Sequence, residues 1–149
     1  MTVCASKPRE TRHFLDNSPR TRDSTAMVPI LQVSLGGAIG ASARYMTGLM
    51  MARLLGKGFP WGTLTVNIVG SFAMGALVVL LAHVNGNKFA PLLMTGLLGG
   101  FTTFSAFSLD AVTLYERGQV GLAAGYVAAS VCLSLAALFA GLLVARSFT

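Results

Sequence analysis

The sequence predicts an all-α membrane protein with four transmembrane helices, the third of which is interrupted. Two observations lead to this fold class. Hydrophobic types make up 54% of the 149 residues and only 11% are charged, whereas soluble domains are roughly 25% charged. The apolar residues also gather into four runs, each long enough to cross the roughly 30 Å hydrocarbon core as a helix. Backbone groups in lipid must be satisfied within their own segment, which favours helices.

The chain divides into a polar N-terminal extension, residues 1–27, and a transmembrane domain, residues 28–149. The extension holds five basic and three acidic residues and two prolines, without an apolar run, and this composition predicts disorder. The domain carries only six basic and two acidic residues. Most of its surface is therefore uncharged, and we expect no nucleic-acid partner.

The predicted spans cover approximately residues 29–52, 62–84, 89–114 and 118–145. The connections between them are short, which predicts an up-down-up-down arrangement. The fourth run contains no charged residue, and the first is interrupted only by Arg44. Small residues spaced four apart predict close helix packing at Gly36/Gly40, Ser71/Gly75 and Gly121/Gly125.

The third run has a different pattern. Gly99 and Gly100 are followed closely by Thr102 and Thr103. This density of glycine beside hydroxyl residues predicts a helix break at membrane depth. Such a break is tolerated only where it is buried in protein or lines an aqueous path.

Basic residues in the connections set no clear orientation. One side of the membrane would receive Lys88 and Arg146, and the other would receive Arg53, Lys57 and Arg117. Such a balance allows insertion in both directions and permits an antiparallel, dual-topology homodimer. The basic extension favours a single orientation, so these two expectations are in tension.

Several polar residues within the spans share a helix face. Thr63, Asn67 and Ser71 are four residues apart in the second span, so they lie on one side of it. Interhelical hydrogen bonds explain Thr and Ser readily. For Asn67 an interhelical bond and a functional role are both open, because polar residues in a membrane are costly.

Two further groups lie in the third and fourth spans. Phe104 and Phe107 share a face among threonines and serines, and Tyr126, Ser130 and Ser134 form a hydroxyl stripe. Each set is also compatible with helix packing. A phenyl edge carries partial positive charge and can contact a small anion without binding it tightly.

The charged residues favour an anion over a cation or a proton. Arg44 is the basic residue well inside a span, and it either reaches the interface or pairs with a carboxylate. Asp110 and Glu116 lie late in the third span or just after it. No acid therefore lies in mid-membrane, where proton coupling would need one.

From about residue 30 to residue 145 the chain resembles the CrcB/Fluc family of fluoride channels. The resemblance rests on residues 36–45 (GGAIGASARY), 62–72 (GTLTVNIVGSF) and 99–108 (GGFTTFSAFS). Tyr126 and Ser130 fit the fourth span. The family pattern does not call for the extension.

The resemblance implies a channel for passive efflux of cytoplasmic fluoride, which confers fluoride resistance, in the plasma (inner) membrane of a bacterium. Two antiparallel copies, or a pair of related chains, would form two narrow pores at their interface. Asn67 would donate a hydrogen bond to fluoride, and phenyl edges would line the path. The implied pore residues are Asn67, Phe104, Phe107, Tyr126 and Ser130, with Thr63 and Ser134 extending the same polar line.

The resemblance also implies a vestibule residue and a metal ion. Arg44 matches a basic residue near the pore vestibule. The backbone carbonyls of Gly99 and Thr102 would hold one structural Na⁺ on the dimer axis. The family usually has Glu where this chain has Asp110, and the shorter side chain leaves Asp110 outside the predicted pore.

Two other classes of membrane protein remain as alternatives. A small dual-topology multidrug-type transporter also uses four helices, but it requires a membrane-embedded carboxylate. A non-transporting membrane assembly protein would explain the small-residue faces and leave the polar faces without a purpose. We expect no enzymatic activity, because the sequence offers no nucleophile–base pair and no metal-ligand cluster.

Overall fold

The computed structural model describes residues 23–84 and 86–149, and every element within them is helical. In chain order the elements are α1 (Asp23–Leu55), α2 (Trp61–His83), the 3₁₀ turn η2 (Gly86–Phe89), the π-helix η3 (Pro91–Leu98), α3 (Gly99–Phe101), α4 (Phe104–Glu116) and α5 (Val120–Ser147). The predicted all-α class is thus confirmed for the described part of the chain.

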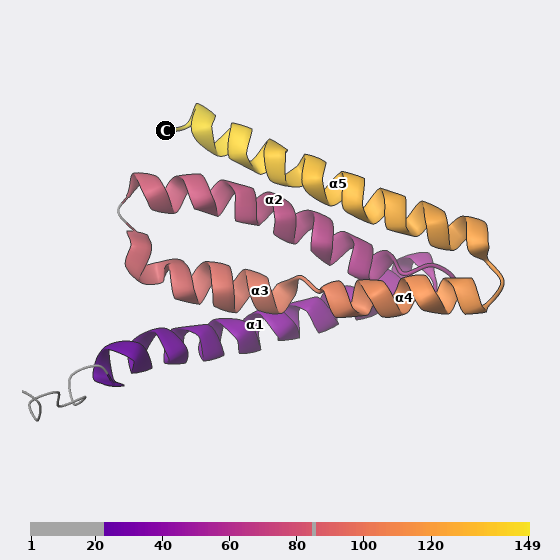
Figure 1. The fold of residues 1–149 in the computed structure, drawn as a ribbon, viewed down its shortest axis with the longest axis horizontal. Helices are drawn as coiled ribbons and strands as arrows, with labels where there is room; N and C mark the ends of the chain where they lie inside the picture. The colour runs from indigo at the N-terminus through magenta and orange to yellow at the C-terminus, as the bar shows by residue number, and fades with distance from the viewer. Residues whose placement is uncertain (1–22, 85) are drawn as a thin grey trace, which may run out of the picture.

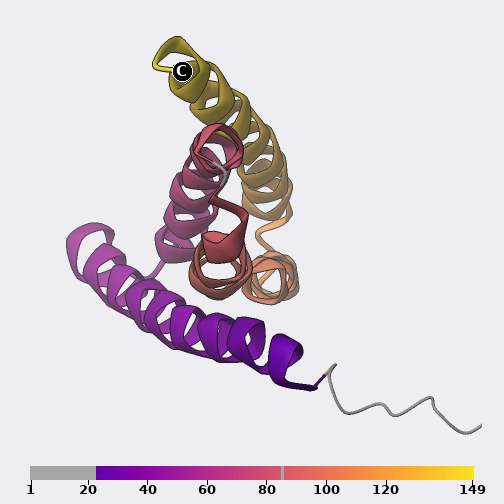
Figure 2. The same cartoon turned by 90° about the vertical axis from the view of Figure 1, so that its left-hand side faces the viewer.

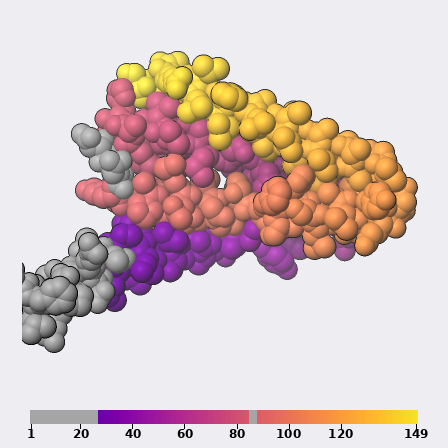
Figure 3. Space-filling model, in the orientation of Figure 1, coloured from indigo at the N-terminus to yellow at the C-terminus, as the bar shows by residue number. Residues whose placement is uncertain are grey.

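The helices form an elongated bundle. In Figure 1, α2 and α5 lie side by side, and η3, α3 and α4 follow one another along a common line. Figure 2 shows α1 and α5 on opposite sides, with α2, α3 and α4 between them. In the space-filling view α5 and α1 form opposite long edges of the molecule (Figure 3).

Three helical segments are long and apolar enough to cross a membrane: Trp61–His83, Pro91–Glu116 and Val120–Ser147. Helix α1 is not among them, so the first predicted span, residues 29–52, stays a prediction. Helix α1 begins at Asp23, within the segment predicted to be a disordered extension. Residues 1–22 of that extension lie outside the described residues.

Two of the helix pairs, α2 with α5 and α1 with η3, approach each other closely at glycines. A Cβ atom at Gly75 in α2 would collide with the Leu138 carbonyl of α5, and one at Gly141 would collide with the Phe72 carbonyl. Gly36 and Gly40 of α1 have the same relation to the backbone of η3. Because these glycines lack side chains, the backbones approach closely.

At Gly121 and Gly125 the same prediction is not met within one chain. Nothing lies within 4 Å of a Cβ atom built at either position. Helix α5 approaches α2 closely at Gly141, which lies 16 residues after Gly125. The GxxxG spacing in the first half of α5 therefore marks no packing contact within one chain.

Close packing holds only a small core. Leu64, Leu114, Ala123 and Tyr126 are buried together near the α4–α5 turn, and that turn contains Gly118 at a φ of 74°. Many large apolar side chains of α1 and α5 are exposed instead. Such a surface fits contact with lipid or with a second protein chain.

Candidate functional site

The helical path is interrupted between α3 and α4. Thr102 and Thr103 have extended backbones, with φ/ψ of −79°/157° and −155°/121°. The N–H and the hydroxyl of Thr102 both donate to the Leu98 carbonyl, at 2.9 and 3.0 Å. The Thr103 hydroxyl accepts a hydrogen bond of 3.2 Å from the Ala106 N–H and caps α4. An N-cap threonine is a usual way to begin a new helix.

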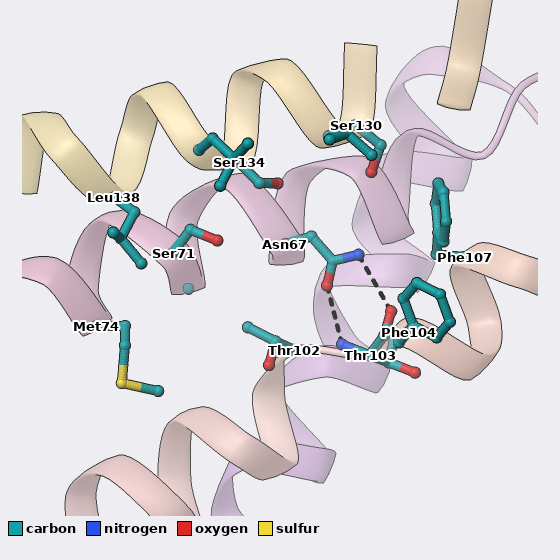
Figure 4. A pocket seen from close by; sticks show the side chains of 13 residues that line it. Asn67, Ser71, Met74, Thr102, Thr103, Phe104, Phe107, Ser130, Ser134 and Leu138 are labelled. Carbon is teal, nitrogen blue, oxygen red and sulfur yellow. Dashed lines mark hydrogen bonds between the residues drawn. The ribbon is translucent and has the colours of Figure 1, made fainter. Parts of the chain in front are cut away.

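Asn67 of α2 lies opposite this break and pairs with both peptide groups of Thr103 (Figure 4). Its Nδ2 donates to the Thr103 carbonyl at 3.1 Å, and the Thr103 N–H donates to its Oδ1 at 2.9 Å. Of the two interpretations left open by the sequence, the structure shows the interhelical bond. An amide nitrogen carries two hydrogens, so one hydrogen of Nδ2 is not needed for this pairing.

The break leaves two backbone carbonyls without the N–H donors that a continuous helix would give them. In a continuous helix the Thr103 N–H would donate to the Gly99 carbonyl, and the Ala106 N–H would donate to the Thr102 carbonyl. Both donors are used elsewhere, by Asn67 and by the Thr103 hydroxyl. The Gly99 and Thr102 carbonyls therefore lose their helical partners.

A groove of about 370 Å³ opens beside the break and is walled by α2, α4 and α5 (Figure 4). No acidic or basic side chain lines it. The groove brings together five of the predicted pore residues: Asn67, Phe104, Phe107, Ser130 and Ser134. Ser71, which the sequence placed on the Asn67 face of α2, lines it as well.

One hydroxyl group in the groove differs from the hydroxyls of α1. Ser34 and Ser42 of α1 donate to carbonyls of their own helix, at 2.9 and 2.8 Å. The buried Oγ of Ser134 has no hydrogen-bond partner within the described part of the chain. Buried polar groups without partners are rare because they lose hydration. The groove therefore has unused hydrogen-bonding capacity at Ser134.

The two phenylalanines stand at the end of the groove nearest the α4–α5 turn. Their ring centroids are 5.5 Å apart with the planes tilted by 42°. The Phe104 side chain is 78% exposed, whereas Phe107 also contacts the ring of Tyr126 at 5.5 Å. Because Phe104 is exposed, the edge of its ring is accessible to an ion in the groove.

Thr63 and Tyr126 are not among the groove-lining residues, although both were predicted to line the pore. The Thr63 hydroxyl donates to Asp110 Oδ2 at 2.6 Å, and the Tyr126 hydroxyl donates to the same oxygen at 3.4 Å. Tyr126 is fully buried, with Phe59 and Phe107 each 5.5 Å away. Asp110 thus binds the hydroxyl groups of two predicted pore residues. The sequence offered one sign that Asp110 belongs near the site: it lies three residues after Phe107, so the two share one face of α4.

Thr63 and Asp110 also line a second pocket of about 260 Å³ together with Lys57 of the α1–α2 connection. Arg44 is partly exposed on α1 and lines neither this pocket nor the groove. The described residues contain no cluster of histidine, cysteine or acidic side chains that could hold a metal ion. A cation at the break would therefore depend on backbone oxygens.

These features define a multi-pass helical membrane protein with an uncharged, mainly apolar groove that carries a few amide and hydroxyl groups beside a broken helix. The chain belongs to the CrcB family, since residues 31–142 match the family described as CrcB-like protein, Camphor Resistance (CrcB). The resemblance seen in the sequence is thereby confirmed.

Relatives from three bacteria are similar over nearly their whole length. The chain is 68% identical over 119 residues to the fluoride-specific ion channel FluC of Cereibacter sphaeroides, covering 80% of this chain and 95% of that protein. It is 60% identical over 116 residues to the protein of that name from Paracoccus denitrificans, covering 78% and 93%. The one from Agrobacterium fabrum is 55% identical over 123 residues, covering 81% and 98%.

The hydrogen bonds to Asp110 predict different effects of removing each hydroxyl. Thr63→Val removes the 2.6 Å bond and is expected to lower the free energy of unfolding by about 1–3 kcal/mol. Tyr126→Phe removes only the 3.4 Å bond and keeps the ring packing, so its effect is expected to be smaller. Unfolding in detergent measures both effects. Thr113→Val is the control, because the Thr113 hydroxyl donates within its own helix, and an equal loss in Thr63→Val and the control would contradict the prediction.

Proposed function

We propose that this protein is a fluoride-selective ion channel that allows passive efflux of cytoplasmic fluoride and so confers fluoride resistance. The observation that carries the proposal is the uncharged groove, in which amide and hydroxyl groups face phenylalanine rings beside a helix break. The relatives at 68%, 60% and 55% identity carry the name fluoride-specific ion channel. This name agrees with the chemistry of the groove.

Fluoride is small and strongly hydrated, so a pore must offer close hydrogen-bond donors in place of water. The second Nδ2 hydrogen of Asn67 and the hydroxyls of Ser130 and Ser134 are such donors in the groove. Binding must also remain weak enough for the ion to leave. The edges of Phe104 and Phe107 meet that second requirement, because their positive charge is only partial.

The uncharged lining favours a passive channel over a coupled multidrug-type transporter. Proton coupling requires a carboxylate that is exposed to the transport path. None of the groove-lining side chains is acidic, and Asp110 is bonded to Thr63 instead. A non-transporting assembly protein would not need a buried serine hydroxyl without a partner, as at Ser134.

We further propose that two antiparallel copies complete the pore, each groove being closed by the other chain. The groove of one chain has a volume of about 370 Å³, which is much larger than a dehydrated halide, and it is open on one side. The 78% exposed Phe104 and the exposed apolar face of α1 give a second chain surfaces to cover. A related chain inserted in the opposite direction would satisfy the same requirement.

In this arrangement α1 also crosses the membrane as the first span, and the chain lies in the inner membrane of a bacterium. The hydroxyls of Ser34, Ser42 and Thr47 donate to carbonyls four residues earlier, which lets α1 enter lipid without unpaired polar groups. Arg44 would supply positive potential to a vestibule. Thr63 and Tyr126 would act at the approach to the groove, where Asp110 holds them.

We also propose that the break holds a structural sodium ion between the two copies. The donor chemistry fits, because the Gly99 and Thr102 carbonyls have lost their helical donors and hard cations prefer oxygen ligands. Each chain supplies only two such carbonyls, so a second copy would be needed to complete a site. A bound cation would add fixed positive charge near the anion path.

Fluoride release from liposomes tests the channel. Fluoride is expected to leave rapidly, as measured with a fluoride electrode, while chloride is retained. Phe107→Ile and Ser134→Ala are expected to slow release by about tenfold or more, which corresponds to 1.4 kcal/mol in the barrier. Ser42→Ala is the matched control, because that hydroxyl bonds within α1. A folded protein that releases no fluoride would refute the channel proposal for this chain alone.

Labelling from the two sides of the membrane tests the antiparallel homodimer. Lys57→Cys, in the exposed α1–α2 connection, is made in a protein whose own Cys4 and Cys132 are replaced by serine. A membrane-impermeant maleimide is expected to label about half of the molecules from outside and the rest after permeabilisation, as dual topology requires. Labelling from one side only would contradict the homodimer and point to a related partner chain.

Removal of sodium tests the cation site. Thermal unfolding is compared in sodium chloride and in N-methylglucamine chloride at equal ionic strength. A ligand that binds only the folded state stabilises it by about 2.7 kcal/mol when its free concentration is about 100 times its Kd. The melting temperature is therefore expected to be higher in sodium. Identical melting temperatures would argue against a structural sodium ion.

A further inference from the structure

We infer that Asn67 is a positioning residue that holds the α3–α4 break open by bonding both peptide groups of Thr103. This role is separate from donation of a hydrogen bond to a permeating ion. The effect of this role on fluoride and sodium rests on the proposed function, whereas its effect on the backbone at the break does not.

The geometry of Thr103 supports this assignment. The residue is only 8% exposed, so its peptide groups must find partners within the protein. Asn67 satisfies both, the N–H through Oδ1 and the carbonyl through Nδ2. A primary amide presents a donor and an acceptor side by side, which is the complement of the two groups that Thr103 presents.

The cap of α4 explains why Thr103 depends on a partner outside its own helix. The Thr103 hydroxyl accepts from the Ala106 N–H, and its φ of −155° is far from the helical region. While this cap persists, the Thr103 N–H does not reach the Gly99 carbonyl in helical geometry. Without Asn67 a buried N–H would lack an acceptor, which destabilises the break.

The assignment links the groove to the carbonyls on the other side of the break. Asn67 lines the groove, and its amide stabilises the extended Thr103 conformation in which the Thr103 N–H does not reach the Gly99 carbonyl. The side chain that contacts an ion in the groove is thus also the one that keeps a carbonyl available for a cation. If Asn67 acted only as an ion donor, its loss would change fluoride release and leave the backbone at Thr103 unaltered.

Hydrogen exchange followed by mass spectrometry distinguishes the two roles in the full-length protein. Asn67→Ala removes both bonds, and Asn67→Asp keeps an acceptor for the Thr103 N–H. We expect exchange of the segment containing Thr103 to be about tenfold faster in Asn67→Ala than in the wild type, with Asn67→Asp in between. Ser71→Ala is the matched control, one helical turn further along the same groove wall, and should exchange at the wild-type rate.

Wild-type exchange at Thr103 in Asn67→Ala would overturn the assignment. So would an equal acceleration at the α2–α5 crossing, because that would indicate general loosening. If Asn67→Ala does not fold, Asn67→Ser serves in its place, since its shorter side chain does not span both Thr103 groups.

A second readout uses sodium. The increase in melting temperature that sodium gives to the wild type is expected to be lost in Asn67→Ala and kept in Ser71→Ala. A full increase in Asn67→Ala would contradict the link between Asn67 and the freed carbonyl. Failure of the wild type to release fluoride would refute the channel instead, and the exchange pattern would still decide the role of Asn67.

Discussion

The paired hydrogen bonds between Asn67 and the Thr103 peptide groups are the interaction on which the site depends. They join α2 to the point where α3 ends and α4 begins, and they satisfy backbone groups that the interrupted helix leaves without partners. A break in a membrane helix is stable only when such groups are satisfied by protein or water. The same bonds place Asn67 at the wall of the groove and release the Gly99 carbonyl.

The remaining polar groups show how an apolar chain tolerates hydroxyls. Several serine and threonine hydroxyls of the described helices, such as those of Ser42, Ser108 and Thr113, donate to a carbonyl four residues earlier. These groups cost little in lipid because each already has a partner. Ser134 differs, since its buried hydroxyl has none within the described residues. The groove is thus distinguished by the unused hydroxyl of Ser134 and not by the number of its polar residues.

The nearby acidic residue, Asp110, is also hydrogen-bonded within the protein and does not line the groove. The Asp110 carboxyl group accepts from Thr63 and Tyr126 and lies beside the second pocket, with Lys57 in the same lining. An acidic group facing a narrow anion path would repel the ion over several ångströms. Asp110 does not line the groove; it is linked to it only through Tyr126, whose hydroxyl it accepts from and whose ring contacts Phe107.

The sequence by itself determined the helical class, the three membrane-capable segments and five of the residues that line the groove. Hydropathy and four-residue spacing depend only on neighbours along one helix, so Asn67, Ser130 and Ser134 could be predicted as polar faces. Contacts between helices decided the rest. Thr63 and Tyr126 have the same register as the groove residues, yet both meet Asp110 because α2, α4 and α5 converge there. Gly121 and Gly125 have packing spacing but no neighbour, because α5 meets α2 at Gly141. Periodicity identifies which residues share a face, and only the crossing of the helices determines what that face meets.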